Sequence, residues 1–294
     1  MFTAATIVTA EVEQQIEQLS ALAPLHNPAN LAGIRAARQA FPGVPNVAVF
    51  DTAFHQTLAP AAYTYAIDTA LAAEHGIRRY GFHGTSYQYV SRRAAELLGR
   101  DDLRLIVFHL GNGASVAAID SGRSVETSMG MTPLEGLVMG TRSGDLDAGI
   151  LFHLGRAGYD LSALDMELNK NSGLRGLAGN GDMRDVQRSA AEGDAAAQLA
   201  LDVYHHRLRH YLGAYHALLG GADAIVFTAG VGENSPATRA AAVSGLEGLG
   251  IRLDSARNQA GETTISADDS TVAILVVPTN EELEIARQAV AALG

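Results

Sequence analysis

Hydrophobic and polar positions predict an α/β protein from about residue 103 onwards. Residues 103–109 form a short apolar run, and a turn at Leu110–Gly113 leads into further runs at 114–119 and 124–128. Three strands joined by tight turns indicate an antiparallel meander. Beyond it, the pattern predicts strands at 224–228 and 272–278, and helices at 148–154, 162–170, 195–219, 235–246 and 281–292.

The first hundred residues carry a weaker pattern. Apolar residues at helical spacing predict helices over 11–22 and 29–40, and residues 44–50 read as a buried strand with Asp51 at its carboxyl end. A meander followed by alternating helices and strands is the order of a ribonuclease-H-like α/β domain. We therefore expect an α/β protein built from ribonuclease-H-like domains, of which the first is truncated.

Composition narrows the classes of function. Twenty-one basic against 32 acidic residues give a net charge of −11, which argues against a nucleic-acid or membrane partner. The chain has no cysteine, which excludes disulfides and thiolate chemistry. Lys170 is the only lysine, so a P-loop is absent and phosphate must be held by arginine, backbone N–H groups and a metal. No apolar run approaches the ~20 residues of a membrane span, and we expect a cytoplasmic protein.

Two glycine-rich turns follow predicted strands. The stretch His109–Ser115 is either an ordinary hairpin turn or a phosphate cradle with His109 as an additional donor. The stretch Ala229–Ser235 lies between a strand and a helix, where unpaired N–H groups bind anions. It lacks the third glycine of the dinucleotide fingerprint.

Arg142 and His83 are each flanked by glycine-rich sequence. Arg142 suits a phosphate clamp on a flexible loop, but it is equally compatible with a surface charge beside Asp145, which would cap the next helix. His83 is either a satisfied polar residue in a turn or a donor to an anionic transition state, as neutral imidazole or as imidazolium.

The long helix at 195–219 carries His206 and His210 four residues apart. The glutamate of a zinc-binding HExxH motif is missing, so we expect these histidines on the helix surface. A core-facing stripe is expected on the same helix at Leu199, Val203, Tyr211, Leu212, Tyr215 and Leu218.

Taken together, the motifs resemble the acetate kinase family (acetate and propionate kinases) within the actin, Hsp70 and sugar-kinase superfamily. The similarity runs collinearly from end to end of the chain. The stretches that carry it are Ala23–Gly33, Phe50–Gln56, Arg79–Ser91, His109–Ser115, Met131–Asp147, Ser172–Arg184, Ala224–Ser235 and Pro278–Leu283.

The resemblance implies reversible transfer of the γ-phosphoryl group of ATP to acetate, giving acetyl phosphate and ADP, with Mg²⁺ or alternatively Mn²⁺. It also implies a homodimer formed through the long-helix region. Arg142 and His83 would stabilise the transferring group, Asp51 would orient Arg142 or the substrate side, and Glu281 would help to hold the metal. The implied acetate pocket is Leu25, His26, Phe82 and Pro133. The implied nucleotide site is His109, Leu110, Gly111, Asn112, Gly113, Asp182, Met183, Arg184, Gly230, Val231, Gly232, Glu233 and Asn234.

The chain departs from the family pattern in two ways. Tyr87 stands where the family usually has histidine, and the family's opening phosphate loop and second catalytic arginine are not found. We therefore expect residues 1–53 and 284–294 to form a remnant of the first domain. At 44–50 and at the last helix, an apolar face or open edge should be exposed, covered by a partner chain or rearranged. Residues 54–283 would form the nucleotide-binding domain with a helical insertion, and turnover would be impaired. The alternatives are a propionate or butyrate kinase, or an inactive nucleotide-binding protein.

Overall fold

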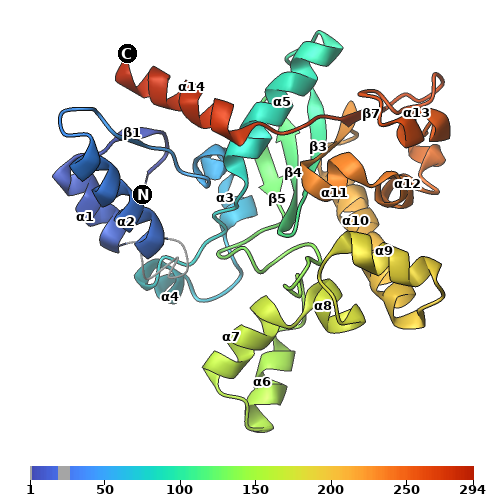
Figure 1. Cartoon of the computed structure of the whole chain (residues 1–294), viewed down its shortest axis with the longest axis horizontal. Helices are drawn as coiled ribbons and strands as arrows, with labels where there is room; N and C mark the ends of the chain where they lie inside the picture. Colours follow the sequence, from blue (N-terminus) through green and yellow to red (C-terminus); the bar gives the residue numbers. More distant parts are fainter. Residues whose placement is uncertain (1, 19–26) are drawn as a thin grey trace.

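A five-stranded mixed sheet lies at the centre of the computed structural model, which describes residues 2–18 and 27–294 (Figure 1). The strand order is β5-β4-β3-β6-β7. Strands β3, β4 and β5 form an antiparallel meander, and β6 and β7 run parallel to β3. This is the predicted ribonuclease-H-like arrangement. The strands are β3 (Arg104–Leu110), β4 (Ala114–Asp120), β5 (Arg123–Thr127), β6 (Ala224–Thr228) and β7 (Ala273–Val276).

Helices cover both faces of this sheet. Because side chains alternate along a strand, Leu105 and Val107 pack with α5 (Gly84–Leu98), whereas Ile106 and Phe108 pack with α10 (Ala195–Leu218). Apolar burial on both faces holds the strand ends, and hence the site, in place. The other elements after residue 50 are η2 (Ala53–Thr57), α3 (Pro60–Tyr63), α4 (Thr69–Glu74), α6 (Gly149–Arg156), α7 (Leu161–Lys170), α8 (Gly173–Ala178), α9 (Met183–Ala191), α11 (Ala229–Asn234), α12 (Pro236–Val243), η3 (Glu247–Leu249), α13 (Ser255–Ala260) and α14 (Glu281–Leu293).

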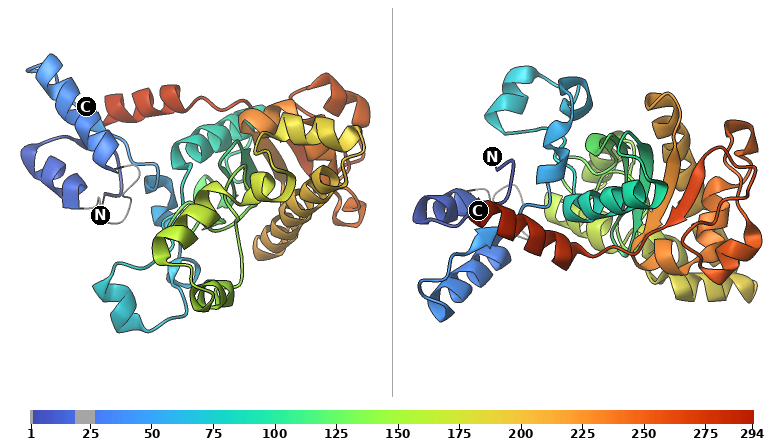
Figure 2. Two further views of the ribbon diagram at one scale, coloured as in Figure 1. Left: turned by 60° about the horizontal axis from the view of Figure 1, so that its bottom comes forward. Right: turned by 90° about the horizontal axis from the view of Figure 1, so that it is seen from above.

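Residues 2–18 and 27–50 form a small separate core beside α14 (Figures 1 and 2). It contains α1 (Ala10–Gln18), α2 (Asn27–Ala40), and a two-stranded antiparallel ribbon of β1 (Thr6–Ile7) and β2 (Val47–Ala48). The prediction of a strand over 44–50 is therefore wrong in its length, because only Val47 and Ala48 pair with β1. Val44 and Val290 are exposed, as expected for this region.

Two helical predictions need correction. Helix α5 was missed, because its first turn consists of glycine, threonine and serine that read as a site loop. On α10, Leu212 and Tyr215 of the predicted stripe are buried, but Leu199, Val203 and Leu218 are exposed. The buried face also includes Leu201, Tyr204 and Leu208.

The surface positions predicted for His206 and His210 are confirmed, because both side chains are exposed. Among the described residues, no group of three or more His, Cys, Asp or Glu side chains could hold a metal ion. Over the same residues, no helix combines the length and the apolar character needed to cross a membrane.

Candidate active site

Three segments follow the carboxyl ends of the parallel strands. These are the β3–β4 turn at 111–113, helix α11 directly after β6, and the segment between β7 and α14. A cavity of 590 Å³ opens beside the first two. Ligands of open α/β sheets bind at this edge, because backbone N–H groups and helix N-termini converge there. The lining residues are Gly111, Asn112, Gly140, Leu174, Gly181, Asp182, Met183, Arg184, Gln187, Tyr204, Gly230, Val231, Asn234 and Ser235.

Eight of the thirteen predicted nucleotide-binding residues line this cavity, and His109, Leu110, Gly113, Gly232 and Glu233 do not. Leu110 is fully buried in the core, and Gly232 packs beneath the site against Phe227. The Glu233 carboxylate does not face the cavity, since its Oε1 accepts hydrogen bonds from the N–H groups of Ala229 (2.8 Å) and Thr279 (3.2 Å). It therefore ties α11 to the segment that follows β7.

Six lining residues were not predicted as site residues, and they come from separate segments of the chain: Gly140, Leu174, Gly181, Gln187, Tyr204 and Ser235. Four of them, Gly140, Leu174, Gly181 and Ser235, lie inside stretches that resemble the family, whereas no local motif marks Gln187 and Tyr204. The stretch predicted as a loose turn at 229–234 is instead the short helix α11, entered at Ala229 with a positive φ of 64°.

Gly140 lies where three segments that line the cavity pack together, its own loop and those of Asn112 and Gly181. A Cβ at this position would lie 2.1 Å from Asn112 Oδ1 and 2.9 Å from the Gly181 carbonyl oxygen. Gly140→Ala must therefore separate these segments, at a cost of about 1–3 kcal/mol. We expect ADP to bind about tenfold more weakly by calorimetry. Gly213→Ala on α10, where a Cβ meets nothing within 4 Å, is the matched control. Equal affinities of the two variants would contradict this role.

Arg142 lies against the β3–β4 turn. A Cβ on Gly113 would be 3.5 Å from Arg142 Nη2, and Nη1 donates to the Pro133 carbonyl at 2.9 Å. The side chain is half-buried, and no ion pair with it is found among residues 2–18 and 27–294. Burial lowers the pKa of Arg142, but a guanidinium stays charged at neutral pH. Among the described residues, the site thus holds a cation without an ion-pair partner, which suits an anionic ligand.

Two anchors hold the loop that carries Arg142. On one side, Arg79 donates to Glu135 Oε1 at 2.8 Å and to the Thr127 carbonyl at 3.0 Å. On the other side, Asp145 accepts from Tyr211 Oη at 2.7 Å and from the Gly136 N–H at 2.8 Å. The alternative in which Asp145 caps the next helix is therefore wrong.

His83 is held by its backbone as well as by its ring. It caps α5 with a positive φ of 57°, and its N–H donates to Asp51 Oδ2 at 2.5 Å. Asp51 Oδ1 lies 3.1 Å from the Thr85 hydroxyl on the first turn of α5. Negative charge at a helix N-terminus is favourable. Among the described residues, the Asp51 carboxylate thus contacts the start of α5. That Asp51 orients Arg142 stays a prediction.

Three histidines near the start of α5, His55, His83 and His109, carry neutral imidazole rings. The His83 ring stacks on His109 with centroids 4.0 Å apart, and burial lowers the pKa of His83 to about 3, with Arg142 nearby adding to the shift. Burial also lowers the pKa of His109. His55 is fully buried with its pKa lowered to about 4 by burial, and its Nε2 donates to the Phe82 carbonyl at 2.9 Å. Sequence reasoning assigned no role to His55.

Asp51 and Glu281 face each other across Thr85. The Thr85 hydroxyl lies 3.1 Å from Glu281 Oε2 as well as from Asp51 Oδ1. Burial raises the pKa of Glu281, and the Asp51 charge adds to the rise. A cation would relieve this repulsion. Mg²⁺ is commonly held by one or two carboxylates together with substrate phosphates, so these residues fit the metal.

Only part of the predicted acetate pocket can be described. Leu25 and His26 lie outside the described residues. His55 donates to the carbonyl of Phe82, and Arg142 donates to the carbonyl of Pro133. These bonds fix Phe82 next to His83 and Pro133 next to Arg142.

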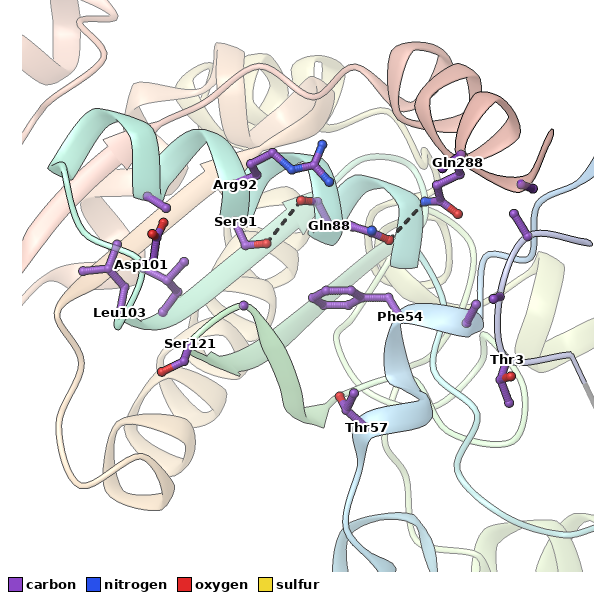
Figure 3. A pocket seen from close by; sticks show the side chains of 18 residues that line it. Thr3, Phe54, Thr57, Gln88, Ser91, Arg92, Asp101, Leu103, Ser121 and Gln288 are labelled. Atoms are coloured by element: carbon purple, nitrogen blue, oxygen red, sulfur yellow. Dashed lines mark hydrogen bonds between the residues drawn. The ribbon is translucent and has the colours of Figure 1, made fainter. Parts of the chain in front are cut away.

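A larger cavity of 740 Å³ lies between α5, α14 and residues 3–5 (Figure 3). Gln88 and Gln288 join across its rim with a 3.0 Å hydrogen bond, and Phe54 lies beneath. It contains none of the predicted site residues.

The strand order and the glycine-lined cavity at the carboxyl edge of the sheet are those of the actin, Hsp70 and sugar-kinase superfamily. Beside the cavity, an arginine without an ion-pair partner among the described residues lies near neutral histidines, which indicates a phosphotransferase. The family model described as the acetokinase family matches residues 1–287. The chain belongs to the acetokinase family, which confirms the predicted resemblance and fold class.

Individual relatives agree with this assignment. The chain is 68% identical to the acetate kinase of Leifsonia xyli subsp. xyli over 98% of this chain and 74% of that protein. Among solved structures, Porphyromonas gingivalis acetate kinase matches with a TM-score of 0.96 and 45% identity, covering 100% of this chain and 75% of that one. A propionate kinase from Francisella tularensis matches with a TM-score of 0.95 and 45% identity, covering 98% and 75%.

Proposed function

We propose that this chain transfers the γ-phosphoryl group of ATP to acetate, giving acetyl phosphate and ADP, at the edge of the 590 Å³ cavity. The observation that supports it best is the Arg142 guanidinium, which has no ion-pair partner among the described residues and lies against the turn at Gly113. The same turn lines the nucleotide cavity through Gly111 and Asn112. An anionic group leaving the cavity would meet Arg142 and His83.

The chemistry needs no general base in this scheme. Acetate is already ionised at neutral pH, because a carboxylate pKa lies near ~4–5. A carboxylate oxygen attacks the γ-phosphorus, and the bond to the β–γ bridging oxygen breaks. Arg142 and neutral His83 donate to the equatorial oxygens, where charge accumulates in a loose transition state. Asp51 keeps His83 in place through the backbone.

We also propose that Glu281, together with Asp51, holds the Mg²⁺ that accompanies ATP. Such a metal neutralises charge on the β- and γ-phosphates when bound. The predicted nucleotide-binding residues, the acetate pocket that includes Leu25 and His26, and a cytoplasmic location are further parts of this proposal.

The test is a coupled assay of ADP formation with ATP and acetate, set beside calorimetry with ADP. Turnover that depends on acetate supports the kinase. Binding of ADP without turnover would favour the alternative, a nucleotide-binding protein without catalysis. Absence of both would contradict the site itself.

A propionate kinase is the second candidate, because the structural matches to an acetate and a propionate kinase are equally similar in sequence. One methylene changes discrimination by only about 1–3 kcal/mol, so the apolar residues near Phe82 do not decide the acyl length. We expect kcat/KM for acetate to exceed that for propionate. The reverse ratio would assign the chain to propionate.

We propose two domains, formed by residues 1–53 with 284–294 and by residues 54–283. The small core of the first fifty residues supports the division. Helix α14 contacts β1 and β2 as well as α5, where its buried Glu284 pairs with Arg92 at 2.9 Å. The helix therefore connects the two units.

A homodimer through the long-helix region is supported by exposed apolar side chains. On α10, Leu199 and Val203 face solvent, and on the α6–α7 hairpin Phe152, Leu161 and Met166 are exposed by 68%, 85% and 55%. A patch of this kind on one projecting hairpin is typical of an interface.

We expect Leu161→Glu to convert the dimer to a monomer, because it places a charge in the apolar contact. Light scattering after size exclusion measures the mass. Leu97→Glu on α5, also at an exposed leucine, is the control and should leave the dimer intact. An unchanged mass in the Leu161 variant would exclude this face.

A further inference from the structure

A hydrogen-bonded chain of three side chains leads from the core to His83. Tyr87 Oη lies 2.5 Å from Ser115 Oγ, and Ser115 Oγ lies 2.8 Å from His83 Nδ1. Tyr87 and Ser115 are both fully buried, whereas His83 is partly exposed. Neither Tyr87 nor Ser115 has a place in the mechanism described so far.

The protons in this chain can be arranged in three ways. In the first, Tyr87 donates to Ser115, and Ser115 donates to Nδ1 of His83. In the second, protonated Nδ1 donates to Ser115, and Ser115 donates to Tyr87. In the third, both Nδ1 and the phenol donate to Ser115 Oγ, and the proton of the serine hydroxyl then has no acceptor.

Only the first arrangement satisfies every buried donor. Ser115 is the only side-chain or backbone partner of Tyr87 Oη in the described part of the chain, and Ser115 Oγ has only Tyr87 and His83 there. The second arrangement leaves the phenol proton without an acceptor, and the third leaves the serine proton without one. A buried unsatisfied donor costs about 1–3 kcal/mol, which is a factor of roughly 5–150 in population.

We propose that Tyr87 and Ser115 are positioning residues that hold His83 in the tautomer with the proton on Nε2. Nδ1 is then always an acceptor inside the protein, and Nε2–H is the donor left for a ligand. Within the described residues, Nε2 has no hydrogen-bond partner of its own.

Two observations support a fixed orientation of this donor. The His83 ring stacks on His109 at an interplanar angle of 18°, which fixes its plane. Burial raises the pKa of Tyr87 far above its usual value, so the phenol keeps the proton that it donates.

The inference rests on the proposed function for its consequence, because a neutral Nε2–H is the donor that the transferring phosphoryl group would meet. In the other tautomer, the same nitrogen would present a lone pair to an anion. Electrostatic donors act in catalysis only when they are oriented before the reaction.

Long-range ¹H–¹⁵N spectra of the histidine-labelled chain measure the tautomer directly. The His83 signals are identified by their loss in His83→Gln. We expect an unprotonated Nδ1 and a protonated Nε2 at neutral pH, without nucleotide or acetate. A protonated Nδ1 would overturn the proposal. This readout does not depend on turnover, so a failure of the kinase assay alone would concern the proposed function and not the tautomer.

Two conservative variants test the chain of donors. Tyr87→Phe keeps the ring but removes the phenol proton, and the second tautomer should appear in the spectrum. Turnover should fall about 2–10-fold with little change in KM for ATP, the value of one hydrogen bond. Tyr89→Phe on the same helix, where no hydrogen bond of the phenol is found among the described residues, should change neither. An unchanged single tautomer in Tyr87→Phe would contradict the role of Tyr87.

Ser115→Ala separates positioning from packing. It leaves the Tyr87 phenol without an acceptor, so the chain should unfold at lower urea concentration. Adding Tyr87→Phe to Ser115→Ala removes that orphaned donor and should restore part of the stability. Turnover should stay low, because His83 Nδ1 still lacks its donor. A recovery of turnover together with stability would show a structural role only.

Discussion

Arg142→Ala is expected to lower kcat by about 10³–10⁵, the usual contribution of an arginine that neutralises charge on a transferring phosphoryl group. The guanidinium has no carboxylate partner among residues 2–18 and 27–294, and so its charge is available to the substrate. The affinity for ADP should change much less, because the 590 Å³ cavity is lined by other residues.

The measurement is steady-state turnover of acetate together with ADP calorimetry. Arg123→Ala is the control, since Arg123 is exposed on β5 away from the turn. Arg142→Lys should recover little activity, because lysine cannot form the two parallel hydrogen bonds of a guanidinium. Turnover of Arg142→Ala within tenfold of the unmodified chain would contradict the assignment.

Acidification is expected to destabilise the chain through its buried histidines. His55 has no exposed surface and both of its ring nitrogens are engaged, with Ser124 Oγ at 2.8 Å from Nδ1 and the Phe82 carbonyl at 2.9 Å from Nε2. The carbonyl can only accept, so Nε2 carries the proton and Nδ1 accepts from Ser124. Protonation of Nδ1 would reverse that bond and take away the acceptor of the Ser124 hydroxyl proton, which agrees with the pKa of about 4 that burial produces.

The direction follows from proton binding in the two states. The folded pKa is depressed, so between pH ~6.5 and about 4 the unfolded chain binds a proton at residue 55 and the folded chain does not. The free energy of unfolding therefore falls as the pH falls, by about 1.4 kcal/mol per pH unit and about 3 kcal/mol in all. Above this window neither state is protonated, and His55 has no effect. The lowered pKa values of His83 and His109 act in the same direction.

Urea unfolding at several pH values within this window measures the slope. His55→Gln should flatten it, because glutamine keeps one donor and one acceptor but does not titrate. His153→Gln on α6, where the histidine is exposed, should leave the slope unchanged. Equal slopes in the two variants would show that His55 does not cause the acid sensitivity. The comparison also removes the opposite contribution of Glu281, whose raised pKa favours the folded state at low pH.

Local sequence was sufficient for the strands and turns of the central sheet. Residues 224–228 were predicted with the correct bounds, and the meander was correct to within one or two residues. Short apolar runs bounded by glycine and asparagine leave few alternatives to a strand and a tight turn. The first fifty residues were predicted less well, since β2 is only as long as its pairing with β1.

The site was predicted where motifs are contiguous and missed where they are not. Arg142, His83 and the glycine-rich turns stood out because glycine brackets them. His55, Ser115 and Arg79 did not, although each holds a predicted site residue or its neighbour. Their contacts join residues 27 to 56 positions apart, and no spacing rule reports on such pairs.

The order of strands, the glycine-rich turns at their ends and the family of this chain could be read from its amino acids, because each depends on neighbours along the sequence. Tertiary structure alone decided which charges stay unpaired, which histidines are neutral and which nitrogen of His83 is left to donate. Those properties come from burial and from hydrogen bonds between distant segments. A sequence specifies such an environment only after the chain has folded.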